Sequence, residues 1–163
     1  MALHRNPELN AAWDEKNGQI VRKAYVNLGI AADTPRGLLV PVVKDADALT
    51  TYQLAQQITE VVTQARSGTA SPEQLTGGSF TITNIGVFGI DAGTPILVPG
   101  QAGILAVGQI KKKPWVVDDR VEARWVTTLA LSFDHRMVDG AEGSAFLGDV
   151  ASILADPGQT LIL

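Results

Sequence analysis

Two segments of the chain, residues 102–110 and 124–133, are nearly continuous in apolar residues. Runs of this kind are typical of strands buried on both faces, because a surface strand alternates apolar and polar side chains. The segments therefore predict two central strands of a sheet. The rest of the chain has to supply the neighbouring strands and the helices that cover them.

Further strands are predicted in the N-terminal half. Asn17-Gly18 is a strong signal for a tight hairpin turn. After it, one face of the segment carries Ile20, Ala24, Val26, Leu28 and Ile30 at a period of two, which predicts one long strand. Residues 37–43 predict another strand, which Pro41 interrupts, so that an edge position or a bulge is expected. In residues 78–89 a strand precedes a loop rich in glycine. Its side chains divide between two faces: Phe80 and Ile82 on one, Ser79, Thr81 and Thr83 on the other.

Two helices are predicted. Thr50 and Gln53 form a capping box, and Gly68 ends the helix that follows it. The apolar stripe of this helix consists of Leu54, Ile58, Val61, Val62 and Ala65. Residues 71–75 predict a short helical turn, and a final helix carries Phe146, Val150, Ile153 and Leu154 before Pro157-Gly158. Strands and helices without strict alternation predict a mixed sheet with helices packed on one side.

Composition excludes several classes of function. The net charge of −4 at pH 7 disfavours nucleic acid or an anionic membrane as the main partner. No apolar run reaches the length of a membrane span, and residues 1–10 lack the apolar core of a signal peptide. The chain has no cysteine, which excludes disulfides, a thiolate nucleophile and a cysteine-ligated metal and fits a reducing compartment. We expect no metal, nucleic acid or membrane among its ligands.

The segment SFDHRMVDG, residues 132–140, places charged residues directly after an apolar strand. Asp139 follows His135 by four positions, so the two side chains would share a face in a helical turn. A histidine held there could keep one ring nitrogen free as a base near neutral pH. The same spacing also fits a structural turn that only joins a strand to a helix. Spacing alone does not separate the two interpretations.

The residues around this motif resemble a known family. The segment SFDHRMVDGAEGSAFL resembles the active-site segment of dihydrolipoamide acyltransferases, the second component of 2-oxoacid dehydrogenase complexes. Its core, His-x-x-x-Asp-Gly, is also that of chloramphenicol acetyltransferases, which share the fold. Four other segments resemble the same catalytic domain in the same order: residues 27–47, 75–89, 94–114 and 154–163. The resemblance implies a chloramphenicol-acetyltransferase-like α/β fold.

The resemblance also implies a reaction, the transfer of an acyl group between a dihydrolipoyl group and coenzyme A. The family's catalytic histidine corresponds to His135, which would remove a proton from the attacking thiol, and its partner aspartate corresponds to Asp139. The hydroxyl that stabilises the oxyanion corresponds to Thr83. From the residues alone, Thr83 is interpreted more simply as a strand threonine that bonds to a neighbour.

Contacts with coenzyme A are implied at Asp33, Asn84 and Gly108. A glycine would let the narrow pantetheine arm approach the backbone closely. The three lysines of residues 111–113 have two interpretations: they attract coenzyme phosphates, or they face solvent and protect a strand end. We favour the second. The lipoyl group would arrive as a substrate on a separate lipoyl domain.

Family members are trimers with active sites between subunits, so that His135 and Asp139 of one chain would face Thr83 of the next. Their trimers often build larger cubic or dodecahedral cores. The resemblance implies that residues 1–163 are a shortened catalytic domain, without the N-terminal part of the usual domain, the lipoyl domain or the domain that binds the dehydrogenase components. A bacterial cytoplasm is a better fit than a mitochondrial matrix.

Three functions stay open at this point. The first is acyl transfer with His135 as general base, and the second is a catalytically weak oligomeric scaffold. The third, an antibiotic acetyltransferase, is less favoured because the resemblance extends well beyond the shared motif. Acetyl and branched-chain acyl groups are favoured over succinyl. The apolar residues Leu161–Leu163 either anchor one trimer to another or fold back on their own subunit.

Overall fold

A computed structural model describes residues 1–158. Its centre is a six-stranded sheet in the order β10-β7-β6-β3-β4, with β5 also paired to β3. Strand β6 runs parallel to both β3 and β7, whereas β10, β4 and β5 are antiparallel to their neighbours. The predicted mixed sheet is confirmed. The strands are β3 (Leu28–Thr34), β4 (Gly37–Leu39), β5 (Val42–Val43), β6 (Phe80–Asn84), β7 (Gly103–Val107) and β10 (Leu129–Phe133).

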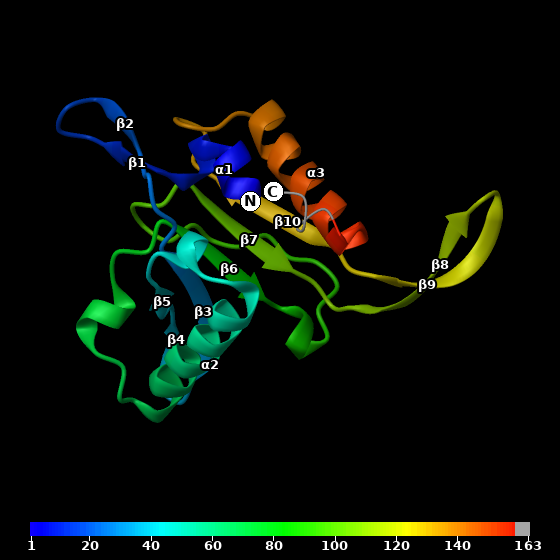
Figure 1. The fold of residues 1–163 in the computed structure, drawn as a ribbon, viewed down its shortest axis with the longest axis horizontal. Coiled ribbons are helices and arrows are strands. Elements are labelled where there is room, and N and C mark those ends of the chain that lie inside the picture. The colour runs from blue at the N-terminus through cyan, green and yellow to red at the C-terminus, as the bar shows by residue number, and fades with distance from the viewer. Residues whose placement is uncertain (159–163) are drawn as a thin grey trace.

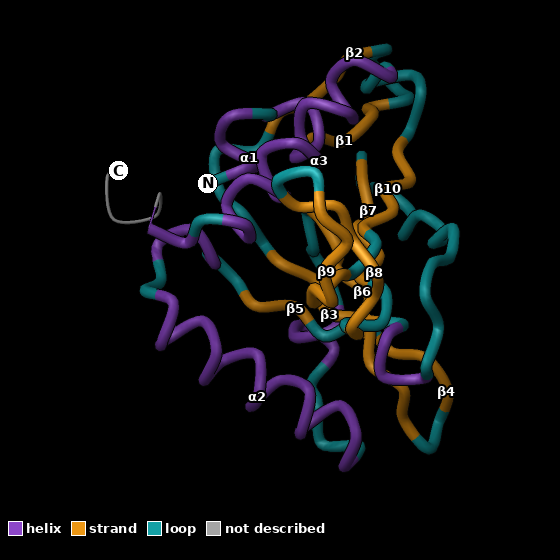
Figure 2. Tube along the Cα trace, turned by 90° about the vertical axis from the view of Figure 1, so that its right-hand side faces the viewer, coloured by secondary structure: helices purple, strands orange, loops and turns teal. Residues whose placement is uncertain are grey.

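The helices cover one face of this sheet. Leu28, Phe80 and Leu105 of the sheet face the same cavity as residues of all three α-helices, α1 (Ala2–Arg5), α2 (Thr51–Ser67) and α3 (Gly140–Ala155). The other face carries Thr83 and the loop of residues 93–98. Figure 1 shows α2 over β3 and α3 along β10, and Figure 2 shows α2 to the left of the strands. Residues 1–158 also contain the 3₁₀-helices η1 (Pro7–Asn10), η2 (Ala46–Ala48), η3 (Pro72–Leu75) and η4 (Gly86–Phe88).

Helix α2 has the predicted caps. The Thr50 side chain accepts a hydrogen bond from the Gln53 N–H at 3.3 Å, and the Gln53 side chain accepts one from the Thr50 N–H at 3.0 Å. Gly68 ends the helix with a φ of 77°, a left-handed conformation that glycine adopts without strain. Val61 and Ala65 are buried against the sheet. The short turn at residues 71–75 and the final helix are confirmed as well.

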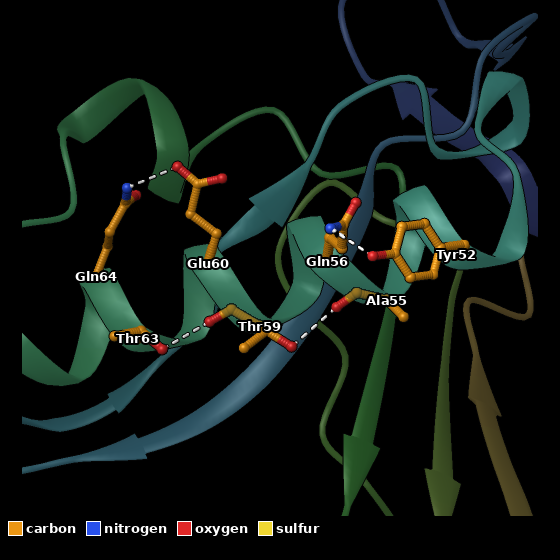
Figure 3. A pocket seen from close by; sticks show the side chains of 7 residues that line it. All are labelled: Tyr52, Ala55, Gln56, Thr59, Glu60, Thr63 and Gln64. Carbon is orange, nitrogen blue, oxygen red and sulfur yellow. Dashed lines mark hydrogen bonds between the residues drawn. The ribbon is translucent and has the colours of Figure 1, made fainter.

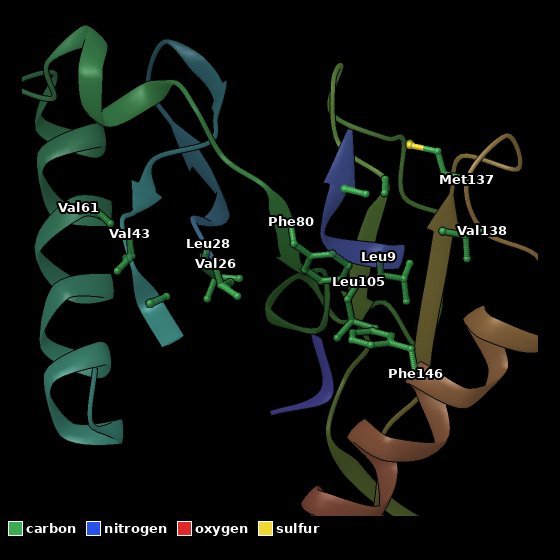
Figure 4. Close-up of a cluster of buried hydrophobic side chains, with 13 residues drawn as sticks. Leu9, Val26, Leu28, Val43, Val61, Phe80, Leu105, Met137, Val138 and Phe146 are labelled. Atoms are coloured by element: carbon green, nitrogen blue, oxygen red, sulfur yellow. The ribbon is translucent and has the colours of Figure 1, made fainter. Parts of the chain in front are cut away.

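The hydrophobic core lies between the helices and the sheet. Phe80 of β6 and Phe146 of α3 pack with their ring centroids 5.3 Å apart, and both side chains are buried. Figure 4 shows this pair and, under α2, Val61 facing Val43 of β5. The pair fixes α3 on the sheet, and therefore also fixes the segment between β10 and α3 that carries the His-x-x-x-Asp-Gly motif.

The prediction of one long strand from the Asn17-Gly18 turn to Ile30 is wrong. The turn exists, between β1 (Ala11–Asp14) and β2 (Gln19–Arg22), but β2 is exposed and the ladder stops at Arg22. The Asn10 side chain donates to the carbonyls of Lys23 and Tyr25 at 3.2 and 2.8 Å. These side-chain hydrogen bonds replace strand pairing, so the chain can turn before β3 begins.

The prediction of one central strand at residues 124–133 is also wrong. The segment divides into β9 (Arg120–Val126), which pairs only with β8 (Lys111–Val117), and β10, which forms an edge of the sheet. At the break, the Thr127 hydroxyl donates to the Gly108 carbonyl at 2.9 Å, and the Gly108 N–H donates to the Thr128 carbonyl at 2.9 Å. An apolar strand that is exposed in a single chain can be covered by the surface of another molecule. The periodicity of the sequence does not show which molecule covers it.

No helix within residues 1–158 is long and apolar enough to cross a membrane. The prediction for Leu161–Leu163 lies outside the described residues.

Candidate active site

The turn after β10 is held by an ion pair between the neighbours of His135. The Arg136 guanidinium donates to both carboxylate oxygens of Asp134, from Nε at 3.0 Å and from Nη2 at 2.7 Å. The Asp134 N–H donates to the Ala102 carbonyl at 2.9 Å, which ties the turn to the start of β7. Arg136 also reaches Glu15 at 3.2 Å and lies 5.3 Å from the centroid of the Trp13 ring. Two charged residues of the motif therefore have a structural role.

Electrostatics of the pair match this geometry. The hydrogen bonds from the Arg136 side chain hold the pKa of the Asp134 carboxyl below its ordinary value, against the opposing effect of desolvation. The Asp134 side chain is only 18% exposed, so solvent screens the pair incompletely. The sequence interpretation did not single out Asp134 or Arg136, although they are the two residues that flank His135 in the sequence.

His135 itself is free of such partners. It is exposed, its ring lies 5.6 Å from that of Phe133, and no hydrogen bond or ion pair joins it to any other residue in the described range 1–158. The ring is therefore presented at the surface by a rigid turn, where it can exchange a proton with a bound thiol.

Asp139 occupies a different position from the one expected. Its backbone is extended, and it caps α3: its carboxylate accepts from the N–H groups of Ala141 at 2.8 Å and Glu142 at 3.1 Å. The Glu142 carboxylate accepts from the Asp139 N–H at 2.9 Å, which completes a capping box. His135 and Asp139 do not share a helical turn, because the helix starts only at Gly140. The turn and the helix cap are adjacent but separate structures.

The other predicted site residues gather at one end of the three parallel strands. Thr83 and Asn84 end β6, Gly108 follows β7, and Asp33 lies near the end of β3. The register aligns Thr83 with Ala31 of β3 and with Ala106 of β7. In open sheets, ligands bind at the carboxyl ends of parallel strands. The structure thus brings Thr83 and the three predicted coenzyme contacts to a single edge.

The Thr83 hydroxyl has no hydrogen-bond partner among residues 1–158, whereas the Thr81 hydroxyl on the same face donates to the Gln101 Oε1 at 2.7 Å. The interpretation of a strand threonine satisfied by a neighbour therefore fits Thr81 and not Thr83. Thr83 lines a pocket of about 250 Å³. Its hydroxyl is available to a ligand.

Two of the three predicted coenzyme contacts are accessible. Asp33 and Asn84 are exposed, and the Asn84 Oδ1 accepts from the Gly86 N–H at 3.0 Å, which leaves the carboxamide nitrogen without a protein partner in residues 1–158. Two arginines that the sequence interpretation missed lie beside them. Arg66 Nε donates to the Asp33 carbonyl at 3.4 Å, and Arg36 packs against Gly68 next to the end of α2.

Gly108 packs tightly against a neighbouring loop. A Cβ at this position would lie 2.0 Å from the Asp91 carbonyl oxygen, so the loop already occupies the space that the glycine provides. Lys111 and Lys113 form ion pairs with Asp91 at 2.7 and 3.3 Å, which lower the pKa of that carboxyl, Lys111 having the larger effect. Gly108 and these lysines therefore anchor the loop of residues 89–101.

His135 and Thr83 belong to opposite ends of the sheet. Phe133, the last residue of β10, pairs with Gly103, whereas Thr83 pairs with Ala106, three residues further along β7. Three residues of strand span about 10 Å, and two strand spacings of about 4.8 Å add to the separation. Figure 1 shows the turn after β10 near α1 and the β1–β2 hairpin, far from the end of β6. One chain therefore cannot bring both side chains to one substrate.

A larger hollow on the outer surface of α2 contains none of these residues (Figure 3). It is lined by polar side chains that bond along their own helix: Gln56 to Tyr52 at 3.2 Å, Thr59 to the Ala55 carbonyl at 2.9 Å, and Gln64 to Glu60 at 3.1 Å. The side-chain hydrogen bonds of this surface therefore run along the helix itself.

Comparison with known proteins places the chain in a family. The family described as 2-oxoacid dehydrogenases acyltransferase (catalytic domain) matches residues 1–162. The chain belongs to this family. The chain is 43% identical over 161 residues to the dihydrolipoyllysine-residue acetyltransferase component of the pyruvate dehydrogenase complex of Staphylococcus aureus, and the match covers 99% of the chain and 37% of that protein. The chain thus spans about a third of the length of this relative.

Solved structures agree with the family. Dihydrolipoamide acetyltransferase of Azotobacter vinelandii superposes on this chain with a TM-score of 0.92 at 35% identity, over 99% of this chain and 66% of that one. Crystallographic and enzymatic work on that enzyme addressed the role in catalysis of a serine, of a histidine 52 positions later, and of an asparagine four positions after the histidine. The cubic core of a pyruvate dehydrogenase multienzyme complex superposes equally well, with a TM-score of 0.92 at 34% identity, over 99% of this chain and 66% of that one.

A chloramphenicol acetyltransferase shares the fold of this chain. The TM-score is 0.53 at 15% identity, over 94% of this chain and 72% of the other. At this identity the likeness shows the fold alone, and it confirms the predicted fold class.

Proposed function

We propose that the chain transfers an acyl group between a dihydrolipoyl thiol and coenzyme A, with His135 as the general base. The observation that carries the proposal is the pair of unpartnered groups: an imidazole on a rigid turn at one end of the sheet and a free threonine hydroxyl in a pocket at the other. Acyl transfer between thiols requires one proton acceptor and one oxyanion donor, which these two groups supply.

The spacing of the groups supports the same assignment. Thr83, His135 and Asp139 are separated by 52 and by four positions, as are the serine, histidine and asparagine of the Azotobacter enzyme. Threonine retains the hydroxyl of serine. Asparagine and aspartate both cap helix N-termini, which is the role that Asp139 has on α3. We therefore assign Asp139 to positioning the start of α3 and the turn before it.

The reaction proceeds through a tetrahedral intermediate. His135 takes the proton of the incoming thiol, and the resulting thiolate attacks the carbonyl carbon of the thioester. The carbonyl oxygen becomes an oxyanion, which accepts a hydrogen bond from the Thr83 hydroxyl. When the intermediate collapses, the carbon–sulfur bond to the leaving thiolate breaks, and that thiolate takes the proton from the His135 imidazolium. The acyl group has then moved from one sulfur to the other.

A second copy of the chain completes the site. Because Thr83 and His135 of one chain are too far apart, we place His135 of one subunit opposite Thr83 of the next, in a trimer that can assemble further. The exposed ribbon of β8 and β9 supports association: Val116, Val121 and Trp125 lie on one face of the ribbon and are 66%, 72% and 69% exposed. A contiguous apolar surface of this kind marks an interaction site.

The edge formed by Asp33 and Asn84 suits coenzyme A. The carboxylate and the free carboxamide nitrogen can bond to the amides of the pantetheine arm, and Arg36 and Arg66 bring positive charge for its phosphates. The dihydrolipoyl group would come from a separate lipoyl domain, in a complex with the dehydrogenase components. Since the relatives are bacterial, we propose the bacterial cytoplasm as the compartment.

A thiol-exchange assay tests the proposal. The full chain is mixed with free dihydrolipoamide and acetyl-CoA, and free coenzyme A is measured as it is released. We expect turnover that depends on the enzyme and is lost in His135→Asn. Oligomers without turnover would instead support the competing function, a scaffold that holds other enzymes of a complex.

A further inference from the structure

The pocket beside Thr83 has an uncharged lining that is largely aliphatic. Ala31, Thr83 and Ala106 lie side by side on one rung of β3, β6 and β7 and form its floor. Its walls come from Leu38 of β4 and from the loop of residues 93–98. Every residue that lines it is uncharged, and most are aliphatic. The polar groups of the lining are three threonine hydroxyls, of which that of Thr81 donates to Gln101 and that of Thr83 lies on the floor between two alanines. Such a lining fits a ligand with a polar atom next to an alkyl chain.

We propose that this pocket binds the acyl chain of the thioester, that the preferred acyl group is a neutral, branched aliphatic chain rather than acetyl or succinyl, and that Ala31 and Ala106 set its upper size. This inference rests on the proposed function and deepens it, since it names the substrate class.

Geometry links the pocket to the reaction. The Thr83 hydroxyl has to lie within hydrogen-bond distance of the carbonyl oxygen in the transition state. The alkyl chain is attached to the same carbon as this oxygen, so it starts within one bond of the reacting centre. Because Thr83 is itself part of the pocket floor, the first carbons of the chain enter the pocket when the oxygen is bound.

Size distinguishes the candidates. The pocket volume is about 250 Å³, and an apolar cavity of about 150 Å³ already holds a benzene molecule. An acetyl group would leave most of this space unfilled, whereas a branched five-carbon acyl group can contact both the floor and the walls. In an apolar pocket, one additional methylene in the substrate changes the ratio of the two kcat/KM values by roughly 10- to 200-fold.

Charge excludes a dicarboxylic acyl group. The carboxylate at the end of a succinyl chain would be removed from water among neutral side chains, which is costly without a cationic partner. The residues that line the pocket provide none. Lys111 and Lys113 of β8 are already paired with Asp91.

The chain offers a matched pair of variants for the test. Ala31→Val adds two methyl groups to the pocket floor. Ala130→Val makes the same change in β10, on the same rung of the sheet and two strands from Thr83, where the residue does not line the pocket. Each full-length protein is assayed with acetyl-CoA, 3-methylbutanoyl-CoA and succinyl-CoA as donors and dihydrolipoamide as acceptor. Binding of the same compounds is measured by calorimetry without an acceptor thiol.

The wild type should have a kcat/KM at least tenfold higher for 3-methylbutanoyl-CoA than for acetyl-CoA, and the lowest value for succinyl-CoA. Ala31→Val should reduce this ratio about tenfold or more, and Ala130→Val should leave it unchanged. Turnover with a preference for acetyl-CoA, or an unchanged ratio in Ala31→Val, overturns the pocket assignment but not the proposed function. If no donor turns over, the proposed function fails, and calorimetry still decides whether the pocket prefers the branched chain.

Discussion

Thr83 and His135 lie on one sheet but at its opposite ends. Thr83 ends a parallel strand next to a pocket, and His135 follows the antiparallel edge strand β10 on a turn that Asp134 and Arg136 clamp. Each side chain is presented outward without a partner in residues 1–158. The arrangement fits a site shared between two copies of the chain, in which each copy contributes one group.

A mixing experiment tests the shared site. His135→Ala and Thr83→Val should each be inactive as separate proteins. When both are unfolded and refolded together, about a quarter of the sites in random cyclic oligomers should combine the intact His135 of one chain with the intact Thr83 of the other. We therefore expect recovery of about a quarter of the wild-type activity. No recovery in mixed oligomers, verified by light scattering, would show that both groups act from the same chain.

Removing the imidazole tests the general base. His135→Asn should lower kcat by roughly two to four orders of magnitude, because the imidazole is the group that we propose to accept the thiol proton. The side chain is exposed and packs only beside Phe133, so circular dichroism and oligomer size should not change. Activity that survives the substitution would remove His135 from the mechanism, and a loss of assembly would assign it a structural role.

A pair of variants at Thr83 tests the oxyanion donor. Thr83→Ser keeps a hydroxyl and should retain most activity, whereas Thr83→Val keeps the shape and should raise the barrier by roughly 2.7–4 kcal/mol. The loss should appear in kcat rather than in KM, since the hydrogen bond forms in the transition state. Steady-state kinetics on both variants measure this, and equal rates would count against the donor.

The cap of α3 gives a stability prediction. Asp139→Ala removes the side-chain acceptor for the N–H groups of Ala141 and Glu142 and should cost about 0.5–2 kcal/mol in the free energy of unfolding. Asp139→Asn keeps an acceptor and should be close to wild type in stability and in turnover. If Asn impaired turnover as strongly as Ala while it preserved stability, the carboxylate charge would have a role beyond the cap.

The ion pair beside His135 predicts a dependence on pH. The folded state lowers the pKa of Asp134, so its contribution to stability is fully present above the unfolded value of about 3.9 and is lost as the pH falls through the folded pKa. Asp134→Asn should therefore lower the melting temperature at pH 6, and the difference from wild type should shrink below about pH 4. A difference that stayed constant from pH 6 to pH 3 would contradict the assigned ionic contribution.

Local signals in the sequence predicted the local structure well. The capping box at Thr50 and Gln53, the turn at Asn17-Gly18 and the interruption at Pro41 depend on interactions within a few residues, so the sequence specifies them directly. The strand that carries Thr83 and the motif that carries His135 were also found. The role of Asp139 as a helix cap was missed, because the spacing to His135 drew attention away from Glu142, three residues later.

By itself, the sequence determined the two long helices, the caps of α2 and the strands β6 and β7, and it pointed to the side chains that are chemically competent. Only the tertiary structure decided where these groups lie relative to one another. The register of β6, β7 and β10 separates Thr83 from His135, although each lies at or just beyond the end of a strand. The tertiary structure also leaves the apolar residues of β9 exposed. Hydrophobicity favours burial, but it does not specify whether the covering surface belongs to the same chain or to another.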